Sequence, residues 1–316
     1  LNRQTADRLG LSTGEFARAA DLGLHEGTPV AAGLIDAHAG GVGTVGWQDQ
    51  TEAGSATSRM AYVFGTSACT MTSTTEPAFV PGVWGPYFSA MVPGLWLNEA
   101  GQSAAGAAID HLVRFHPAST DALKQAKEAG LGLNQWLAAE AERLAPEGTD
   151  ISRLADGLHV VPEFLGNRAP FADPEAKAVI AGLDMDTSVA ALVRLYVAGI
   201  CGLGYGLRQI VEAQSAKGIR TDTIVVSGGA GQSPLVRQLL ADATGLVIAA
   251  PKTAEPVLLG SAMLGAVAGG LQKDIPAAMA AMSAAGETYA PGGAEATSYH
   301  NKRYEAFELL QQAARK

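Results

Sequence analysis

The sequence predicts an α/β fold in which helices flank a mixed β-sheet. Two β-rich runs at residues 61–74 read as a hairpin, and strand and helix patterns alternate from residue 223 onwards. Hydrophobic residues make up 47% of the 316 residues and charged residues 17%, with 38 glycines. This profile is typical of an alanine- and glycine-rich α/β enzyme rather than of a disordered or fibrous chain.

Charge and cysteine content exclude several classes. A net charge of -9 argues against a nucleic-acid surface, which needs a basic face. Cys69 and Cys201 are far apart and match neither a disulfide framework nor a zinc site, which indicates a reducing, cytoplasmic setting. The segment from Val189 to Leu207 is interrupted by Arg194, so we expect a buried helix and no membrane span.

The first 58 residues contain three expected elements. Residues 12–24 predict a short helix with a capping box of Ser12 and Glu15. "TPVAAGLID" predicts a buried strand that ends in Asp36 and opens onto a glycine turn. The polar residues 46–58 are the best candidate for a linker. The start at Leu1, without a signal-peptide pattern, predicts that the chain was cut from a longer polypeptide.

The middle of the chain combines the hairpin with an aromatic loop. Two runs, residues 61–64 and 68–74, are joined by Gly65, Thr66 and Ser67. We expect residues 76–103 to form an ordered loop, because their aromatic side chains are too much apolar surface to leave in water. These are Phe79, Trp84, Tyr87, Phe88 and Trp96. Helical patterns follow at residues 103–115 and 120–145.

The C-terminal half alternates strands and helices. A long helix is expected to start at a cap among residues 186–188 and to stop at Gly218. A strand at residues 223–226 is followed by a helix with Ser233 as N-cap, Pro234 as first residue and Gly245 at its end. The apolar face of this helix consists of Leu235, Val236, Leu239, Leu240 and Ala243.

Three glycine turns follow three β-like runs: "GLIDAHAGG", "VFGTSAC" and "VVSGGAGQS". Glycine lets the backbone approach a ligand and point N–H groups at it, as phosphate sites require. Each turn alone is a weak signal, because glycine more often serves a plain turn than a ligand site. Neither a P-loop nor a GxGxxG fingerprint occurs, so hairpin N–H groups would have to hold any phosphate.

In this order, the three turns resemble the carbohydrate kinases of the FGGY family, which belong to the actin-like ATPase superfamily with its ribonuclease H-like fold. The stretch "GNRAPFADPEAKAVIAGLDMDTSVAALVRLYVAGICGLGYGLRQIVE" resembles a second signature region of that family. "FVPGVWGPYFSAMVPGLWLNEAGQSAAGAAIDHLV" and "GLIDAHAGG" resemble the branch that phosphorylates D-ribulose. The resemblance extends from about Thr28 to Tyr304.

The resemblance implies a role for each matching residue. Asp36 matches the catalytic base that accepts the proton of the attacking sugar hydroxyl, and its carboxylate is expected to project into an interdomain cleft. His38 is a candidate substrate contact. The nucleotide-binding residues implied are Gly65, Thr66 and Ser67 in the hairpin, Gly106 near a helix start, and Gly228, Gly229 and Ser233 in the last turn. No residue is assigned to a metal.

Several residues keep a second interpretation. Ser233 can be an N-cap alone, and His38 a local hydrogen-bonding group. Cys69 reads as a small buried residue. The polar residues Asn98, Glu99 and Gln102 either face the substrate or close the aromatic loop. Trp84, Tyr87, Phe88 and Trp96 read as core or oligomer-interface residues rather than as a platform for sugar, and suggest a homodimer.

One family motif is missing from these residues. The first phosphate motif, Asp-x-Gly-Thr, does not occur. We therefore interpret residues 1–47 as the C-terminal remnant of the sugar-binding actin-like domain, residues 48–285 as the nucleotide-binding domain and residues 286–316 as a helical tail. The chain would be the C-terminal part of a larger enzyme, as an expressed fragment, a proteolytic product or a truncated gene.

The expected function of the intact protein is ATP- and Mg²⁺-dependent phosphorylation of a ketopentose, D-ribulose to D-ribulose 5-phosphate, with the fragment inactive alone. Kinases for L-ribulose, xylulose, glycerol or another polyol stay open, because the absent domain would supply most sugar contacts. A non-catalytic nucleotide-binding or oligomerisation module is the alternative from another class. A chaperone- or actin-like ATPase is disfavoured by Asp36 and the aromatic loop.

Overall fold

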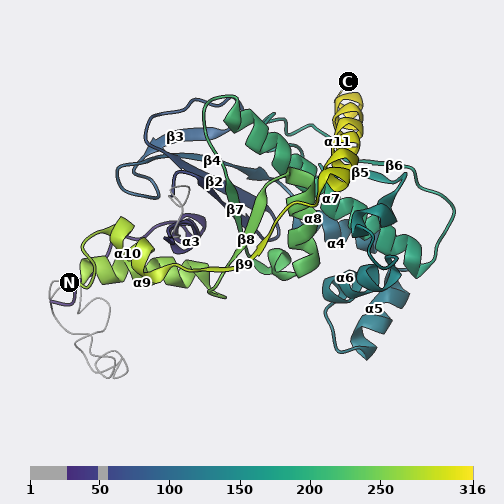
Figure 1. Cartoon of the computed structure of the whole chain (residues 1–316), viewed down its shortest axis with the longest axis horizontal. Coiled ribbons are helices and arrows are strands. Elements are labelled where there is room, and N and C mark those ends of the chain that lie inside the picture. The colour runs from purple at the N-terminus through teal and green to yellow at the C-terminus, as the bar shows by residue number, and fades with distance from the viewer. Residues whose placement is uncertain (1–26, 49–55, 316) are drawn as a thin grey trace.

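A seven-stranded mixed sheet forms the centre of the computed structural model, which describes residues 27–48 and 56–315 (Figure 1). Its strand order is β3-β4-β2-β1-β7-β8-β9. The strands are β1 (Arg59–Phe64), β2 (Ala68–Thr74), β3 (Trp84–Phe88), β4 (Trp96–Gln102), β7 (Thr223–Ser227), β8 (Val247–Pro251) and β9 (Ala285–Tyr289). The expected helix at residues 12–24 and part of the expected linker lie outside the described residues.

The predicted hairpin is confirmed at the centre of this sheet. β1 and β2 are antiparallel, with Val63 opposite Cys69, and β4 continues the antiparallel set beyond β2. On the other side β7 runs parallel to β1, and β8 runs parallel to β7. At the far edge, β9 pairs antiparallel with β8. The predicted mixed sheet is therefore confirmed, with β1, β7 and β8 as its parallel part and antiparallel strands on both sides of them.

Helices cover both faces of the sheet. Since successive side chains of a strand point to opposite faces, neighbouring residues of one strand pack against different helices. Ala61 of β1 and Val225 of β7 pack in the cluster that contains α3 (Asp36–Val45), α9 (Pro256–Ala268) and α10 (Ile275–Met282). Tyr62 and Val226, one residue further on, pack in the larger cluster on the opposite face, with α4 (Gly106–Phe115), α7 (Val189–Ser215) and α8 (Pro234–Thr244). Figure 1 shows α9 and α10 at the opposite end of the molecule from α5 and α6.

The remaining elements lie beyond the second face. They are α5 (Ser119–Glu128), α6 (Leu133–Leu144), η1 (Ile151–Ala155), a small two-stranded sheet of β5 (His159–Val161) and β6 (Val179–Ala181), and α11 (Ala294–Ala314). α11 contacts α8, β5 and α7, so the last helix is packed onto the sheet's helical layer.

α7 is the core helix of this layer. Among the described residues it alone is long and apolar enough to cross a membrane, and 78% of its most apolar window is buried in the protein. Ser188 caps it, as expected, by accepting a hydrogen bond from the N–H of Ala191. A Cβ on Gly202 would collide with the carbonyl of Val160, which explains glycine inside a helix. These contacts identify α7 as a buried helix of the fold.

The strand expected at residues 28–36 is wrong. Residues 28–35 form no strand, the side chain of Ile35 is 57% exposed, and Asp36 is the first residue of α3. The glycines after Asp36, expected in a turn, lie inside this helix. Gly43 would collide with the carbonyl of Pro256 if it carried a Cβ, so close packing on α9 overrides the low helix propensity of glycine.

The aromatic segment also differs from expectation. It contains β3 and β4 rather than a loop throughout, and the expected burial of its aromatic side chains is wrong for four of them. Phe79 is 74% exposed, and Trp84, Tyr87 and Phe88 are exposed as well. β3 is an edge strand of the sheet, so on one side it has no neighbouring strand among the described residues.

The unit formed by β7 and α8 matches the sequence prediction closely. The hydroxyl of Ser233 accepts a hydrogen bond from the N–H of Val236, Pro234 begins the helix, and Gly245 ends it with φ of 71°. All five predicted apolar-face residues are buried. Local capping signals and a regular apolar pattern were sufficient here because they agree with the packing.

The α3–α9 contact gives a stability prediction. Gly260→Ala should lower the free energy of unfolding by about 1–3 kcal/mol, because the new Cβ would collide with the backbone carbonyl of Ala39. Gly265→Ala in the same helix is the matched control. No atom lies within 4 Å of its Cβ position, so helix propensity should stabilise it by up to about 1 kcal/mol. Urea unfolding measures both, and equal effects would contradict the packing argument.

Candidate functional site

The hairpin turn and the last glycine turn meet at one end of the sheet. β1 and β7 are parallel neighbours with Val63 opposite Ser227, so Gly65 and Gly228 both lie just after the strand ends. Gly228 has φ of 92°, and a Cβ there would lie 2.6 Å from the carbonyl oxygen of Phe64. This position therefore requires glycine for both backbone conformation and space. The structure brings these two predicted segments together.

The hairpin is closed by its own backbone and by the start of α4. The N–H of Gly65 donates to the carbonyl of Ser67 at 3.0 Å, and the N–H of Gly106 donates to the carbonyl of Gly65 at 2.9 Å. Gly106 thus braces the hairpin from the first turn of α4. Among the described residues, no acceptor contacts the N–H or hydroxyl of Thr66 or of Ser67. These four donors are available to a ligand.

The last turn leads directly into α8. After Gly228 the chain forms the short 3₁₀ helix η2 (Gly229–Gln232), and Ser233 then caps α8. Arg237, which the sequence analysis did not single out, donates from its Nε to the carbonyl of Gly231 at 2.8 Å. This contact fixes the turn from the first turns of α8. Ser233 is confirmed as an N-cap, and a ligand contact stays a prediction.

Asp36 lies at the same end of the sheet because α3 runs antiparallel to β1. The C-terminal end of α3 is held at the start of β1, where the buried Arg59 donates to the carbonyls of Val45 and Trp47. Gly40 faces the side chain of Val63, near the other end of β1. The first residue of α3 must then lie beside the hairpin turn that follows β1.

The carboxylate of Asp36 is open to solvent. Asp36 is exposed, and its Oδ1 accepts a hydrogen bond from the N–H of Ala37 at 2.7 Å. No other side chain in the described ranges bonds to it. An ionised carboxylate with a free oxygen is what proton acceptance from a hydroxyl requires.

His38 is held by a carboxylate from another element. Its Nε2 lies 3.1 Å from Oε2 of Glu99 on β4, and both side chains are largely shielded. The pair joins α3 to the antiparallel half of the sheet. Glu99 therefore contacts His38 rather than closing the aromatic loop, and a contact with the substrate stays a prediction.

Asn98 and Gln102 close the structure around the aromatic segment. Asn98 is fully buried, and its Nδ2 donates to the carbonyl of Ala78. Gln102 accepts a hydrogen bond from the hydroxyl of Tyr62 and donates to the carbonyl of Leu203. The loop-closing interpretation therefore holds for Asn98, and Gln102 ties β4 to β1 and α7.

Cys69 and Arg168 lie next to this end of the sheet. Cys69, expected to be buried, is half-buried, and Arg168 donates to its Sγ at 3.4 Å. Burial raises the pKa of the Cys69 thiol, although the charge of Arg168 opposes the shift, so the sulfur stays protonated. Arg168 also stacks over Trp84 at 5.1 Å. Sequence reasoning missed Arg168, because nothing near it in the chain marks a contact made 99 residues away.

The arrangement suits an anionic ligand near a carboxylate. α3, α4 and α8 all begin at this end of the sheet, and helix N-termini carry partial positive charge and attract phosphate. The free donors of Thr66 and Ser67 lie in the hairpin turn, next to the turn at Gly228. The geometry therefore offers phosphate-binding groups and, from α3, one candidate proton acceptor.

Comparisons with known proteins identify the family of the chain. The profile of the FGGY family of carbohydrate kinases, C-terminal domain, matches residues 60–269. An FGGY carbohydrate kinase domain-containing protein of Xenopus laevis is 44% identical over 297 residues, covering 92% of this chain and 54% of that protein. A D-ribulokinase of Saccharomyces cerevisiae is 37% identical over 266 residues, covering 79% of this chain and 37% of that protein.

Solved structures agree on the fold. The gluconate kinase of Lactobacillus acidophilus superimposes with a TM-score of 0.71 at 18% identity, over 95% of this chain and 54% of that one. The xylulose kinase of Rhodospirillum rubrum superimposes with a TM-score of 0.70 at 23% identity, over 94% of this chain and 54% of that one. The chain spans about half the length of these relatives. The predicted actin-like fold is confirmed, and the chain belongs to the FGGY family of carbohydrate kinases.

Proposed function

We propose that the polypeptide to which these residues belong transfers the γ-phosphate of ATP to a hydroxyl of a ketopentose, D-ribulose in the first place. The observation that carries this proposal is the meeting of the Gly65–Ser67 hairpin, the Gly228–Gly229 turn and Asp36 at one end of the sheet. Phosphoryl transfer needs little more than positioned phosphates, an aligned hydroxyl and a proton acceptor. These three segments supply such groups.

Each segment has one task in this proposal. The N–H and hydroxyl groups of Thr66 and Ser67 bind ATP phosphates, while Gly65 and Gly106 hold the hairpin in shape. Gly228 and Gly229 let the nucleoside approach the backbone, and Ser233 lies beside it at the start of α8. Mg²⁺ would bind mainly to the phosphates, where it offsets their charge.

Asp36 is the proposed base and binds the sugar hydroxyl. Its neighbour on the same helix, His38, is a proposed substrate contact whose ring orientation is set by Glu99. The two residues are about 200° apart around the helix axis at 100° per residue, so both reach one sugar only if it lies across the start of α3.

D-Ribulose is favoured by the named relatives. The D-ribulokinase of Saccharomyces cerevisiae, which is 37% identical, favours the D-sugar. A ribulokinase of Mycolicibacterium smegmatis, 32% identical over 282 residues, favours ribulose as the sugar without distinguishing its D and L forms. Residues 1–47 as part of a sugar-binding domain, residues 48–285 as the nucleotide-binding domain and residues 286–316 as a tail stay part of this proposal. With most sugar contacts outside the chain, these residues alone should turn over little or no substrate.

Assembly and location complete the proposal. The exposed aromatic residues on edge strand β3 suit a contact with a second copy, so we infer a homodimer. A monomer by light scattering at micromolar concentration would contradict it. Cys69 and Cys201 are both free thiols, which suits a reducing cytoplasm.

Coupled ADP release by the full-length polypeptide tests the function against D-ribulose, L-ribulose, D-xylulose, ribitol and glycerol. A clear preference for D-ribulose supports the reaction and its branch. Activity on another of these compounds keeps the reaction class and contradicts the branch. Binding of ATP without any turnover moves the proposal to a non-catalytic nucleotide-binding module.

Asp36→Asn in that polypeptide should lower turnover by about two to four orders of magnitude, the usual contribution of a general base. ATP affinity should stay unchanged, because the carboxylate contacts only its own helix start. Asp121→Asn, which alters an exposed acid in the first turn of α5, is the matched control. Steady-state kinetics and calorimetric titration with ATP measure the two effects.

The complementary variant is Thr66→Val, which removes one proposed phosphate donor at constant size. It should weaken ATP binding by about 10- to 100-fold, because a hydrogen bond to a charged group contributes about 1.5–3 kcal/mol. Thr288→Val on the exposed strand β9 is the control. If Asp36→Asn keeps most of the wild-type turnover, Asp36 is not the base. If Thr66→Val binds ATP with wild-type affinity, Thr66 does not bind the phosphates.

A further inference from the structure

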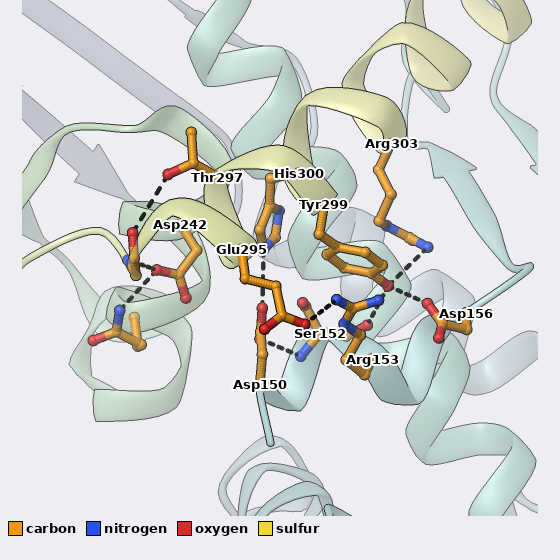
Figure 2. Close-up of polar contacts among 12 residues, drawn as sticks. Asp150, Ser152, Arg153, Asp156, Asp242, Glu295, Thr297, Tyr299, His300 and Arg303 are labelled. Carbon is orange, nitrogen blue, oxygen red and sulfur yellow. Dashed lines mark hydrogen bonds and ion pairs between the residues drawn. The ribbon is translucent and has the colours of Figure 1, made fainter. Parts of the chain in front are cut away.

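A second polar cluster lies near the C-terminal end of α8, whereas the proposed nucleotide site lies at the N-terminal end of that helix. The inference drawn from this cluster does not depend on the proposed function. Asp150 precedes η1, Asp242 lies near the end of α8, and His300 lies on α11 (Figure 2). One oxygen of each carboxylate and one ring nitrogen of His300 lie within 4.8 Å of one another. Asp242 is nine residues from Ser233 along α8, about 13 Å at 1.5 Å per residue, so the cluster is separate from the nucleotide turn.

We propose that Asp150, Asp242 and His300 form a binding site for a divalent transition-metal ion, Zn²⁺ in particular. Two carboxylate oxygens and one imidazole nitrogen are a ligand set that Zn²⁺ accepts, with a fourth position left for water. The three side chains come from segments far apart in the sequence, so a bound ion would join η1, α8 and α11.

The atoms that face one another have no hydrogen-bond partner. His300 is 1% exposed, and among the described residues neither its Nε2 nor Oδ2 of Asp150 has such a partner. These two atoms are 3.7 Å apart, too far for a hydrogen bond but compatible with two ligands of one ion. An unsatisfied imidazole nitrogen this deeply buried is costly, and a metal ion would satisfy it.

The other polar atoms of the three side chains are already held. Oδ1 of Asp150 accepts from the N–H of Ser152 at 2.9 Å, and Oδ1 of Asp242 accepts from the N–H of Gly292 at 2.7 Å. Nδ1 of His300 lies 2.9 Å from the hydroxyl of Tyr205. Metal-binding histidines are commonly oriented by such a contact through the second ring nitrogen. Each ligand is thus positioned while one atom stays free.

Among the described residues, the two carboxylates have no permanently charged cationic partner, and Asp150 faces the imidazole of His300 at 3.7 Å. Neither forms an ion pair with lysine or arginine there, and the nearby Arg303 donates instead to the carbonyls of Ala155 and Leu158. A divalent ion would supply positive charge beside both carboxylates.

An entry path is present. A cavity of about 440 Å³ is lined by Asp150 and Asp242, and its other lining residues include Glu142 but no lysine or arginine. The side chain of Asp150 is 20% exposed, so one ligand reaches the cavity while His300 stays inside. An acidic cavity attracts cations to its mouth.

The test uses the full chain, freed of metal by a chelator that is then removed. Calorimetric titration with Zn²⁺ should show one equivalent bound, and thermal unfolding should shift upward by about 5 °C at a hundredfold excess over Kd. Mg²⁺ at the same concentration should have little effect, because it prefers oxygen ligands in an octahedral arrangement.

His300→Gln and Asp242→Asn should each weaken Zn²⁺ binding by at least about a hundredfold, more than is typical for a residue that only orients a ligand. His111→Gln and Asp110→Asn, at exposed positions of α4, are the matched controls and should bind like the wild type. Should His300→Gln fail to fold, Asp150→Asn at the cavity mouth gives the same readout. Absence of stoichiometric Zn²⁺ binding, or wild-type affinity in a folded cluster variant, overturns the proposal.

Discussion

The contact between α3 and α9 determines where the one candidate catalytic carboxylate lies. Gly43 meets the backbone of Pro256, and Gly260 meets the backbone of Ala39, so the two helices pack backbone to backbone. This allows α3 to lie directly on β1, where Arg59 anchors its C-terminal end. α3 runs antiparallel to β1. With its C-terminal end held by Arg59 and its middle packed on α9, its first residue, Asp36, lies beside the hairpin turn that follows β1.

The same contact explains which parts of the fold were predictable. α8 was predicted with its cap, first proline and final glycine, because local signals and packing favour the same structure there. α3 was not, because four glycines among residues 36–46 are unfavourable in an isolated helix. Its stability comes from partners more than 200 residues away in the sequence, such as Pro256, which a local pattern does not reveal. The exposed aromatic residues of β3 were wrongly expected inside for the opposite reason: apolar character alone does not say which layer covers a strand.

The candidate site also has parts that the sequence predicts and parts that it does not. The two glycine turns were found from the sequence, because glycine after a β-like run is a local signal, and the parallel pairing of β1 with β7 then brings them together. The residues that support them were not found. Glu99 holds His38 and Arg237 holds the turn at Gly231, yet neither contact is marked by spacing or composition. Supporting contacts of this kind depend on side-chain direction and register, which only the folded chain defines.

Asp150, Asp242 and His300 extend this argument to a site with no sequence motif. Metal-binding motifs are recognised when two ligands lie a few residues apart on one element, whereas these three lie on separate elements. Their meeting depends on α11 packing across α8 and η1, where Arg153 pairs with Glu295 and the hydroxyl of Tyr299 donates to Asp156 (Figure 2). α8 therefore has polar contacts near both ends, with the capped nucleotide turn at its start and the buried cluster near its end. With its C-terminal end held by these contacts, α8 keeps Ser233 in one position relative to α7 and α11. The geometry of the Gly228–Gly229 turn therefore depends on packing well outside the candidate site.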